Sequence, residues 1–331
     1  MRYEYDALGN LLKTIRPDGQ EQSWLNYGSG HVYGVVFNQK DLVAFKRDDL
    51  HREVERLLAN GLVEQKEYNP VGLLTAQRIF SEQADHTTHY QAQREYHYDQ
   101  NYLLTQVQDS RLGQINYQYD PVGRLLKSQG QHLQEIFAFD PAGNLIDANT
   151  TGQSKINNNL QTQYQGAHYR YDAQGNVVEK QYQGKILKLQ WDNLNRLQRS
   201  DYDGLQTDYG YDVLGRRIFK KQGRELTLFG WDGDLMIWES YQNQADDHAA
   251  YTKHYLYEPN SFVPLLHTGY QQFIQLIETP DYSQYQTKPY SVYKDPVWKD
   301  TRKQRAELER TLFYHCDQIG TSHCQDSCHP L

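Results

Sequence analysis

One short motif recurs along the whole chain and limits what the chain can fold into. An aromatic residue is followed by Asp or Asn, by two further residues and then usually by Gly. Copies that begin at Tyr171, Trp191, Tyr211 and Trp231 stand 20 residues apart. A period this short predicts one small supersecondary unit per copy. The turn positions of the clearest copies are Asp6 and Gly9, Asn69 and Gly72, Asp120 and Gly123, Asp140 and Gly143, Asp172 and Gly175, Asp192 and Asn195, and Asp212 and Gly215.

The residues before each turn have the pattern of a β-strand. Two places before the aromatic residue lies another large side chain, and the residue between them is mostly polar or Gly, as in Tyr169, Arg170 and Tyr171. A period of two is typical of a half-buried strand, and no helical period of 3.6 fits these segments.

The Asp-x-x-Gly element predicts a hairpin turn with a known mechanism. Asp can accept a hydrogen bond from the backbone N–H two residues further on. Pro70, Pro121 and Pro141 stand second in their turns and preset the φ of a type I turn. Gly in the fourth place supplies a left-handed residue and a G1 bulge, and Asn195 is the next most tolerant substitute. Each copy is therefore predicted to be a strand, a turn and a strand.

Isolated hairpins are not stable, so the copies are expected to stack edge to edge into a long antiparallel sheet that twists and curls. The chain has 28 Tyr among 331 residues, only 38% hydrophobic residues and a mean hydropathy of −0.89. This composition argues against a compact apolar ball, while 13% aromatic residues argue against disorder. We expect an all-β chain whose aromatic stripe lines a wet cavity inside a curled, hollow wall.

Three segments depart from the repeat. It loosens over residues 28–65, where residues 47–54 fit a degraded copy with His51 in the Gly place, while residues 48–59 also fit a helix. Residues 149–165 form an insert rich in Asn, Gln and Thr and are predicted to be a surface loop. Thr301 and Gln304 fit a capping box, which predicts a short exposed helix over residues 301–312.

The C-terminal tail is rich in Cys and His. All three cysteines lie after residue 315, so the main body has no disulfide framework. The spacing matches no zinc pattern well, and we predict no metal site and no cofactor. The weak candidate ligands are Cys316, Cys324, Cys328, His323 and His329.

Several function classes are disfavoured by the sequence. A net charge of −8 argues against a nucleic-acid partner, because nucleic-acid-binding domains carry a clustered basic excess. No apolar stretch predicts a membrane span or a signal peptide. No nucleophile elbow, metalloprotease motif or phosphate loop occurs, and Asp201 and Asp203 are expected in a hairpin turn rather than as a catalytic pair. We therefore expect no enzymatic activity.

The repeated Tyr-Asp-x-x-Gly-Asn/Arg-Leu unit resembles the Rhs/YD-repeat family over nearly the whole chain. A more specific likeness is the segment 313–321, which resembles the start of that family's core. The residues that carry it are Tyr314, His315, Asp317, Gly320 and Thr321. The resemblance implies a hollow β-shell around a variable C-terminal toxin domain, in polymorphic toxins that act in bacterial competition and are often delivered by type VI secretion. It also implies an immunity protein and a secretion spike as partners.

The family pattern is lost after Thr321, so residues 322–331 are expected to be an atypical, truncated tail and the chain a fragment of the shell. The expected organisation is hairpin repeats over 1–277, a connecting segment with the short helix over 278–312, and the core motif over 313–321. Its expected partner is the remainder of the shell, and its expected location is the cytoplasm of the producing cell, with intact relatives secreted.

Two other functions stay open at this level. Aromatic-rich sheets can bind sugars by stacking, which would make the chain a carbohydrate- or surface-binding adhesion module. A glycosidase would need two carboxylates that face one cleft.

Overall fold

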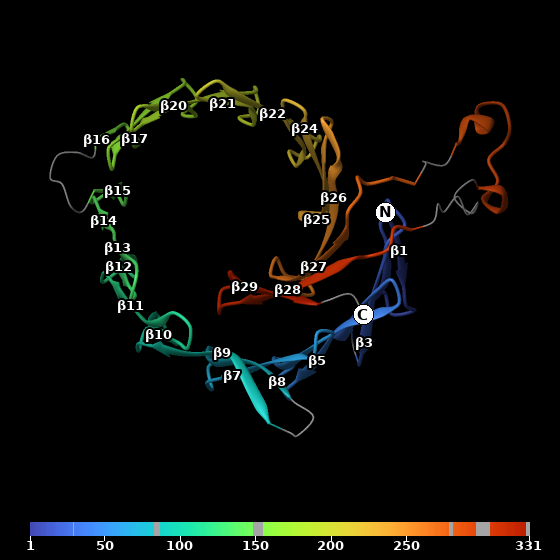
Figure 1. Cartoon of the computed structure of the whole chain (residues 1–331), viewed down its shortest axis with the longest axis horizontal. Helices are drawn as coiled ribbons and strands as arrows, with labels where there is room; N and C mark the ends of the chain where they lie inside the picture. Colours follow the sequence, from blue (N-terminus) through green and yellow to red (C-terminus); the bar gives the residue numbers. More distant parts are fainter. Residues whose placement is uncertain (29, 83–86, 148–154, 278–280, 296–304, 329–331) are drawn as a thin grey trace. The chain divides into compact units, whose positions relative to one another are not determined.

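The computed structural model describes residues 1–28, 30–82, 87–147, 155–277, 281–295 and 305–328. These residues form 29 β-strands and two short 3-10 helices, η1 (Ser283–Gln286) and η2 (Val292–Lys294), so the described chain is nearly all-β (Figure 1). The first strands are β1 (Arg2–Tyr5), β2 (Leu11–Ile15), β3 (Glu21–Tyr27), β4 (His31–Phe37), β5 (Lys40–Arg47), β6 (Glu53–Leu58), β7 (Leu62–Tyr68), β8 (Leu74–Glu82), β9 (Thr88–Tyr98), β10 (Leu104–Asp109), β11 (Gly113–Tyr119), β12 (Leu125–Gln129), β13 (Gln134–Ile136), β14 (Ala138–Phe139) and β15 (Leu145–Ile146).

The remaining strands continue the same pattern to the end of the described chain. They are β16 (Lys155–Asn157), β17 (Leu160–Tyr164), β18 (Ala167–Tyr171), β19 (Val177–Tyr182), β20 (Lys185–Trp191), β21 (Leu197–Tyr202), β22 (Leu205–Tyr211), β23 (Arg217–Gln222), β24 (Glu225–Asp232), β25 (Leu235–Asn243), β26 (Asp246–Tyr257), β27 (Pro264–Tyr270), β28 (Arg310–Cys316) and β29 (Ser322–Cys328).

The chain divides into two compact units. The first contains residues 1–63 and 251–331, and the second contains residues 64–250. In the second unit, β8 to β13 and β16 to β25 each follow one another in strand order, so neighbours in sequence are neighbours in the sheet (Figure 1). The pairing is antiparallel, as the hairpin prediction requires.

The predicted turn geometry accounts for the register of each repeat. Gly175 has a φ of 87° and Asn195 a φ of 58°, the left-handed conformation expected at the fourth turn position. Pairing resumes with one residue skipped, so that Tyr171 lies opposite Val177 while Arg170 lies opposite Glu179. This bulge fixes which face each side chain takes, because a one-residue slip would reverse every position.

The two units are stabilised in different ways. The first has an apolar core that includes Val35, Phe37, Leu256, Leu266 and Phe313, so residues from both of its segments bury the same surface. The second has a small core around Leu74, Tyr96 and Val107. Among the described residues between 111 and 230, only Ala167, Thr207 and Gly230 are buried. That part of the sheet is a thin layer with both faces partly exposed.

The prediction of a helix over 301–312 is wrong for the described residues 305–312. Residues 305–309 form no regular structure and Arg310 begins strand β28. Tertiary bonds explain the difference, because the N–H of Glu309 donates to the Gly269 carbonyl and the Ala306 carbonyl accepts from Gln20. These bonds hold the segment extended. Residues 301–304 lie outside the described residues.

The prediction of a surface loop over 149–165 is also wrong in part, because residues 155–164 form the hairpin of β16 and β17. Asn158 and Asn159 have φ values of 52° and 60°, which suit a tight two-residue turn. Residues 149–154 lie outside the described residues. Over residues 47–54 the degraded copy is confirmed and the helix is wrong, since His51 has a φ of 60° and its N–H donates to the Asp48 carbonyl.

We predict that Gly175→Val lowers the free energy of unfolding by about 1–2 kcal/mol, because a side chain at a left-handed position is strained. Space is not the cause, since the nearest atom to an added Cβ is 3.9 Å away. Urea unfolding followed by circular dichroism measures the change. Gln174→Val is the matched control, because the equivalent residues Val122, Leu194 and Leu214 are apolar and exposed. Equal losses in both variants would contradict the conformational explanation.

Candidate functional site

The repeat aspartates that are followed four residues later by Arg or Asn share one set of bonds. Asp192 Oδ1 accepts the backbone N–H groups of Leu194 at 2.8 Å and Arg196 at 2.9 Å, and its Oδ2 accepts Arg196 Nε at 2.7 Å. One carboxylate therefore caps the turn through one oxygen and fixes the side chain after the turn through the other. The same bonds, with Arg or Asn in the last place, occur at Asp6, Asp48, Asp120, Asp172 and Asp212. Asp140 accepts the backbone N–H and the side-chain amide of Asn144. Asp99 caps its turn through the N–H groups of Asn101 and Leu103.

These bonds keep the turn carboxylates ionised. The side-chain amide of Asn144 and then its backbone N–H lower the pKa of Asp140. The pKa of Asp48 is lowered first by the Arg52 side chain, against a smaller opposing effect of burial. Groups that hold a proton poorly and already accept two or three bonds do not suit general acid catalysis.

The residue after the turn also links one repeat to the next. Arg196 Nη1 donates to the Asp212 carbonyl at 3.1 Å, and Arg216 Nη1 donates to the Gly233 carbonyl at 2.6 Å. Where this residue is Asn176, its amide donates to Asn195 Oδ1 at 2.9 Å. The turns along this edge of the sheet are thus bonded in series.

The repeat aromatics form a second series of bonds. Each donor ring reaches the backbone carbonyl of the fifth residue after the preceding turn Asp or Asn. The pairs are Tyr98 and Leu74, Tyr119 and Leu104, Trp191 and Val177, Tyr211 and Leu197, and Trp231 and Arg217, with distances of 2.8–2.9 Å. The partly buried rings therefore satisfy their polar atoms within the sheet.

In the insert over residues 149–165, a glutamine takes the place of an aromatic ring in this series of hydrogen bonds. Gln161 Nε2 donates to the Leu145 carbonyl at 2.8 Å, in the place of an aromatic ring, and Tyr171 then donates to the Gln161 carbonyl at 2.7 Å. Phe139 has no donor, and the Arg124 guanidinium lies over its ring at 4.7 Å from the centroid.

The core-motif residues form a further turn of the same kind. Asp317 Oδ1 accepts the N–H groups of Ile319 and Thr321, and Gly320 has a φ of 86°. Tyr314 Oη lies 2.7 Å from His267 Nδ1, and His315 is fully buried. Sequence reasoning set this segment apart from the repeat, although its Asp and Gly spacing is the same.

Among the candidate ligands of the tail, the described side chains include only that of Cys316. The Cys316 thiol is buried and donates to the Pro264 carbonyl at 3.6 Å. The side chains of His323, Cys324 and Cys328, and the whole of His329, lie outside the described part. Within that part, no three His, Cys, Asp or Glu side chains form a group that could hold a metal ion.

Asp201 and Asp203 lie at the tight turn between β21 and β22. Asp201 Oδ1 accepts the Gly204 N–H at 2.8 Å, and Asp203 Oδ1 accepts the Ile186 N–H at 3.1 Å. Both carboxylates thus accept backbone N–H groups, and Asp201 Oδ2 also accepts from Gln206 Nε2 at 3.3 Å.

A buried polar cluster in the first unit was missed by sequence reasoning. Arg16 Nη1 lies 3.1 Å from His254 Nδ1, and Arg16 Nη2 donates to Gln22 and to the Tyr255 carbonyl. On the other side, His254 Nε2 lies 3.0 Å from Asp18 Oδ2. The Pro17-Asp18-Gly19 turn is visible in the sequence, but His254 is 238 residues from Arg16 and no local signal joins them.

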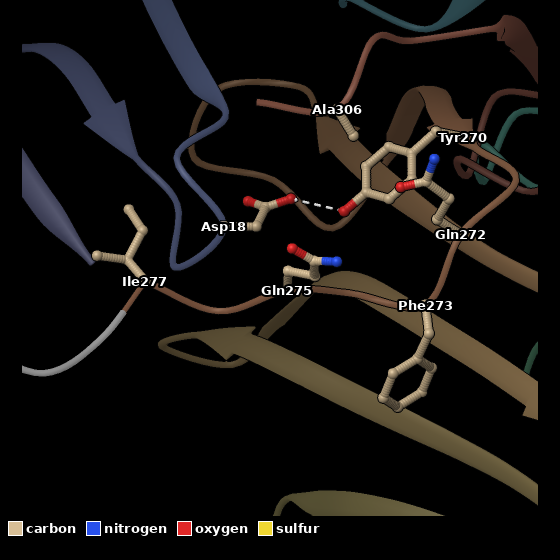
Figure 2. A pocket seen from close by; sticks show the side chains of 7 residues that line it. All are labelled: Asp18, Tyr270, Gln272, Phe273, Gln275, Ile277 and Ala306. Atoms are coloured by element: carbon tan, nitrogen blue, oxygen red, sulfur yellow. Dashed lines mark hydrogen bonds between the residues drawn. The ribbon is translucent and has the colours of Figure 1, made fainter. Parts of the chain in front are cut away.

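The same carboxylate borders a small cavity of about 70 Å³. Tyr270 donates to Asp18 Oδ2 at 3.0 Å, and the side chains of Gln272 and Gln275 complete a polar wall (Figure 2). Burial raises the pKa of the Tyr270 hydroxyl, so it remains a donor.

The cluster holds His254 neutral. Arg has only donors, so His254 Nδ1 accepts from Arg16 and the ring proton is assigned to Nε2, which faces Asp18. Complete burial lowers the pKa of His254, Asp18 opposes this, and the Arg16 charge lowers the pKa further. Protonation of His254 at Nδ1 would place that proton against the Arg16 guanidinium, which is itself a donor, and would therefore break this hydrogen bond.

Comparison with known proteins places this geometry in context. The family model described as Teneurin YD-shell matches residues 59–229. "Double-stranded DNA deaminase toxin A" of Burkholderia cenocepacia is 32% identical over 72% of this chain and 18% of that protein. "Toxin protein Tse5" of Pseudomonas aeruginosa is 28% identical over 97% of this chain and 27% of that protein. The chain thus spans less than a third of the length of these relatives.

Solved structures share the fold. The crystal structure of TcdB2-TccC3-TEV matches 98% of this chain and 17% of that chain, with a TM-score of 0.70 at 14% identity. The Tc holotoxin pore of Photorhabdus luminescens matches with a TM-score of 0.68 at 14% identity.

We predict that Tyr211→Phe lowers the free energy of unfolding by about 1 kcal/mol, because it removes one hydrogen bond between consecutive repeats and leaves the Leu197 carbonyl without that donor. Thermal unfolding measures the loss. Tyr202→Phe is the control, since Tyr202 is exposed and lies under Lys185. The explanation fails if the control is destabilised as much.

We predict that the first unit loses stability as the pH falls below about 6.5, by about 1 kcal/mol per pH unit for one proton. The unfolded chain takes up a proton at His254 there, while the native ring, with its lowered pKa, does not. Asp18 has a lowered pKa and therefore adds a loss of the same sign below pH 3.8.

Urea unfolding at a series of pH values measures this slope. His254→Gln should flatten it between pH 7 and 5, whereas His168→Asn, at an exposed position, should leave it unchanged. A slope that persists in His254→Gln would assign the proton uptake elsewhere.

Proposed function

The chain belongs to the Teneurin YD-shell family, and from this premise we propose that it forms a section of the β-wall of an Rhs-type polymorphic toxin. In the whole protein, this wall would enclose a toxin domain and carry it to a competing bacterium. The fold of the described residues is nearly all-β with antiparallel hairpin repeats, as in the Tc toxin structures that it matches. The role of this section is structural.

One observation carries the proposal. Each repeat is bonded to the next by the turn residues and by the aromatic donors, so the sheet grows by addition of identical units. A layer with so few buried residues between 111 and 230 does not build a globular core. It suits a wall with two faces, of which the aromatic face would line a curled, hollow interior.

The same bonds support the proposal that this section does no chemistry. The turn carboxylates accept backbone and side-chain donors, as at Asp192 and Asp212, and are not available to a substrate.

The three parts of the chain would have different places in the wall. Residues 1–277 would form its hairpin repeats, residues 278–312 a connection, and residues 313–321 the start of the core. In the core motif, we propose a turn-forming role for Asp317 and Gly320.

The partners of this section would be the remainder of the shell and, in the whole protein, a C-terminal toxin domain, an immunity protein and a secretion spike. One relative is named as the toxin protein Tse5, and another as a probable deoxyribonuclease, RhsA, of Dickeya dadantii. Those names describe the whole proteins. We propose synthesis in the cytoplasm of the producer and delivery by a specialised system, including type VI secretion. No helix among the described residues is long and apolar enough to cross a membrane.

A chimera tests the proposal. This chain replaces the matching segment of Tse5, and electron microscopy of the purified chimera should show closed particles, with unmodified Tse5 prepared in parallel as the reference. A second chimera, with the turn residues Asp172, Asp192 and Asp212 changed to Ala, should give open or aggregated material. If the first chimera is folded by circular dichroism but never closes, the chain does not supply shell wall.

A further inference from the structure

One face of the sheet over β18 to β23 has a charge pattern that the hydrogen bonds of the wall do not require. Residues directly opposite each other on antiparallel strands lie on the same face of a sheet. The pairing places one row of side chains across β18 to β22, whose members in strand order are Tyr169, Lys180, Leu187, Tyr202 and Leu205. Lys185 lies opposite Tyr182 and Lys220 opposite Tyr209, so both lysines share this face. We call it the lysine face.

The opposite face of the same strands is balanced in charge. One row across it alternates in sign from strand to strand, with Arg170, Glu179, Lys188 and Asp201 in order. In the next row, Arg199 and Asp208 form an ion pair at 2.6 Å, and Lys221 lies opposite Asp208. Positive and negative groups therefore neutralise one another across the strands of this second face.

The lysine face has no such compensation. The acidic residues of β18 to β23 are Glu179, Asp201 and Asp208, and all of them lie on the opposite face. Carboxylates occur at the borders of the lysine face, where Glu225 begins β24 opposite Gln222 and Asp203 accepts the Ile186 N–H. Between these borders the strands present ammonium groups, rings and apolar side chains.

The lysines of this face are positioned by aromatic rings and keep their charge. Lys180 Nζ lies 5.7 Å from the centroid of the Tyr169 ring, and Lys185 Nζ lies 5.4 Å from that of the Tyr202 ring. Among the described residues, no carboxylate forms an ion pair with Lys180, Lys185 or Lys220. Tyr202 is 45% exposed, so its ring can also pack against a ligand. Apolar and cationic groups exposed together are typical of a contact surface.

We propose that the lysine face binds an extended acidic peptide. Carboxylates of the peptide pair with the ammonium groups, and the rest of its side chains pack on the rings. Lys180 in β19 and Lys220 in β23 are four strand spacings apart, which is about 19 Å at about 4.8 Å each. An extended peptide of about six residues has this length and directs every second side chain to one side.

A nucleic acid also combines negative charge with groups that stack on rings, but it fits this sheet less well. The chain has a net charge of −8, and the carboxylates of Asp172, Asp192 and Asp212 follow one another along one edge of the sheet. A phosphate chain that crosses the sheet carries many charges and is repelled by these groups, whereas a short peptide needs only a few carboxylates.

Binding to the lysine face does not depend on closure of a shell. Only the source of the peptide rests on the proposed function, under which it would be a segment of the enclosed domain. A titration of the chain by itself therefore tests the binding, and the Tse5 chimera separately tests the wall.

The test is a titration of fluorescence anisotropy with the purified full chain. The probe is a fluorescein-labelled octapeptide of four Glu-Ser pairs, and its matched control has Gln in place of every Glu. The acidic peptide should bind at low salt and lose affinity as sodium chloride is added, because salt screens exposed charges. The combined variant Lys180→Gln, Lys185→Gln and Lys220→Gln should bind about tenfold or more weakly, which corresponds to about 1.4 kcal/mol.

The opposite face supplies a matched control variant. Arg170→Gln, Lys188→Gln and Lys221→Gln together remove the same charge from that face and should leave the affinity unchanged. None of the six side chains is buried, and circular dichroism of both variants checks that they fold. The proposal is overturned if the acidic peptide does not bind the wild-type chain, if the Gln peptide binds equally well, or if both variants lose the same affinity. It is also overturned if an oligothymidylate of ten nucleotides binds as tightly as the acidic peptide.

Discussion

The structure depends on one interaction, which is a carboxylate that caps a four-residue turn. Without it, the turn would leave two backbone N–H groups without that acceptor, and the residue after the turn would lose its anchor. The capped turn sets the bulge, the bulge sets the register, and the register places every aromatic ring on the correct face. A local bond therefore determines long-range order in a sheet with little core.

This arrangement explains how a thin sheet can be stable without a second layer. In a layered domain the faces of a sheet are covered, and burial supplies most of the favourable free energy. Between residues 111 and 230 burial is replaced by bonds that repeat at every hairpin, from ring to carbonyl and from Arg or Asn to the next turn. The first unit instead has an apolar core around Phe37, Leu266 and Phe313.

The sequence predicted what is local and missed what is distant. The turns could be found because Asp192 and Asn195 stand three residues apart and the chemistry of the turn lies between them. The Arg16, Asp18 and His254 cluster could not, because His254 lies 238 residues from Arg16 in the sequence. The helix expected over 301–312 failed for the same reason: its local signals were outweighed by the bond of Glu309 to Gly269 in β27 and by that of Ala306 to Gln20, just before β3.

In a repeat protein, each residue can be compared with the residues at the same position of the other copies. At a position where every copy has the same residue type, the wall itself accounts for that residue. Gln161 departs from the pattern, but it donates to the carbonyl that an aromatic ring would reach, so its departure preserves the series of bonds. Arg217 departs where most copies have Leu or Val, and its guanidinium lies over the Tyr209 ring, 4.9 Å from the centroid. Glu53 departs at the same place in the copy that begins at Asp48, and its carboxylate accepts from Arg56. Each of these departures makes a contact of its own within the sheet, so the wall tolerates a change of residue type where the new side chain finds a partner.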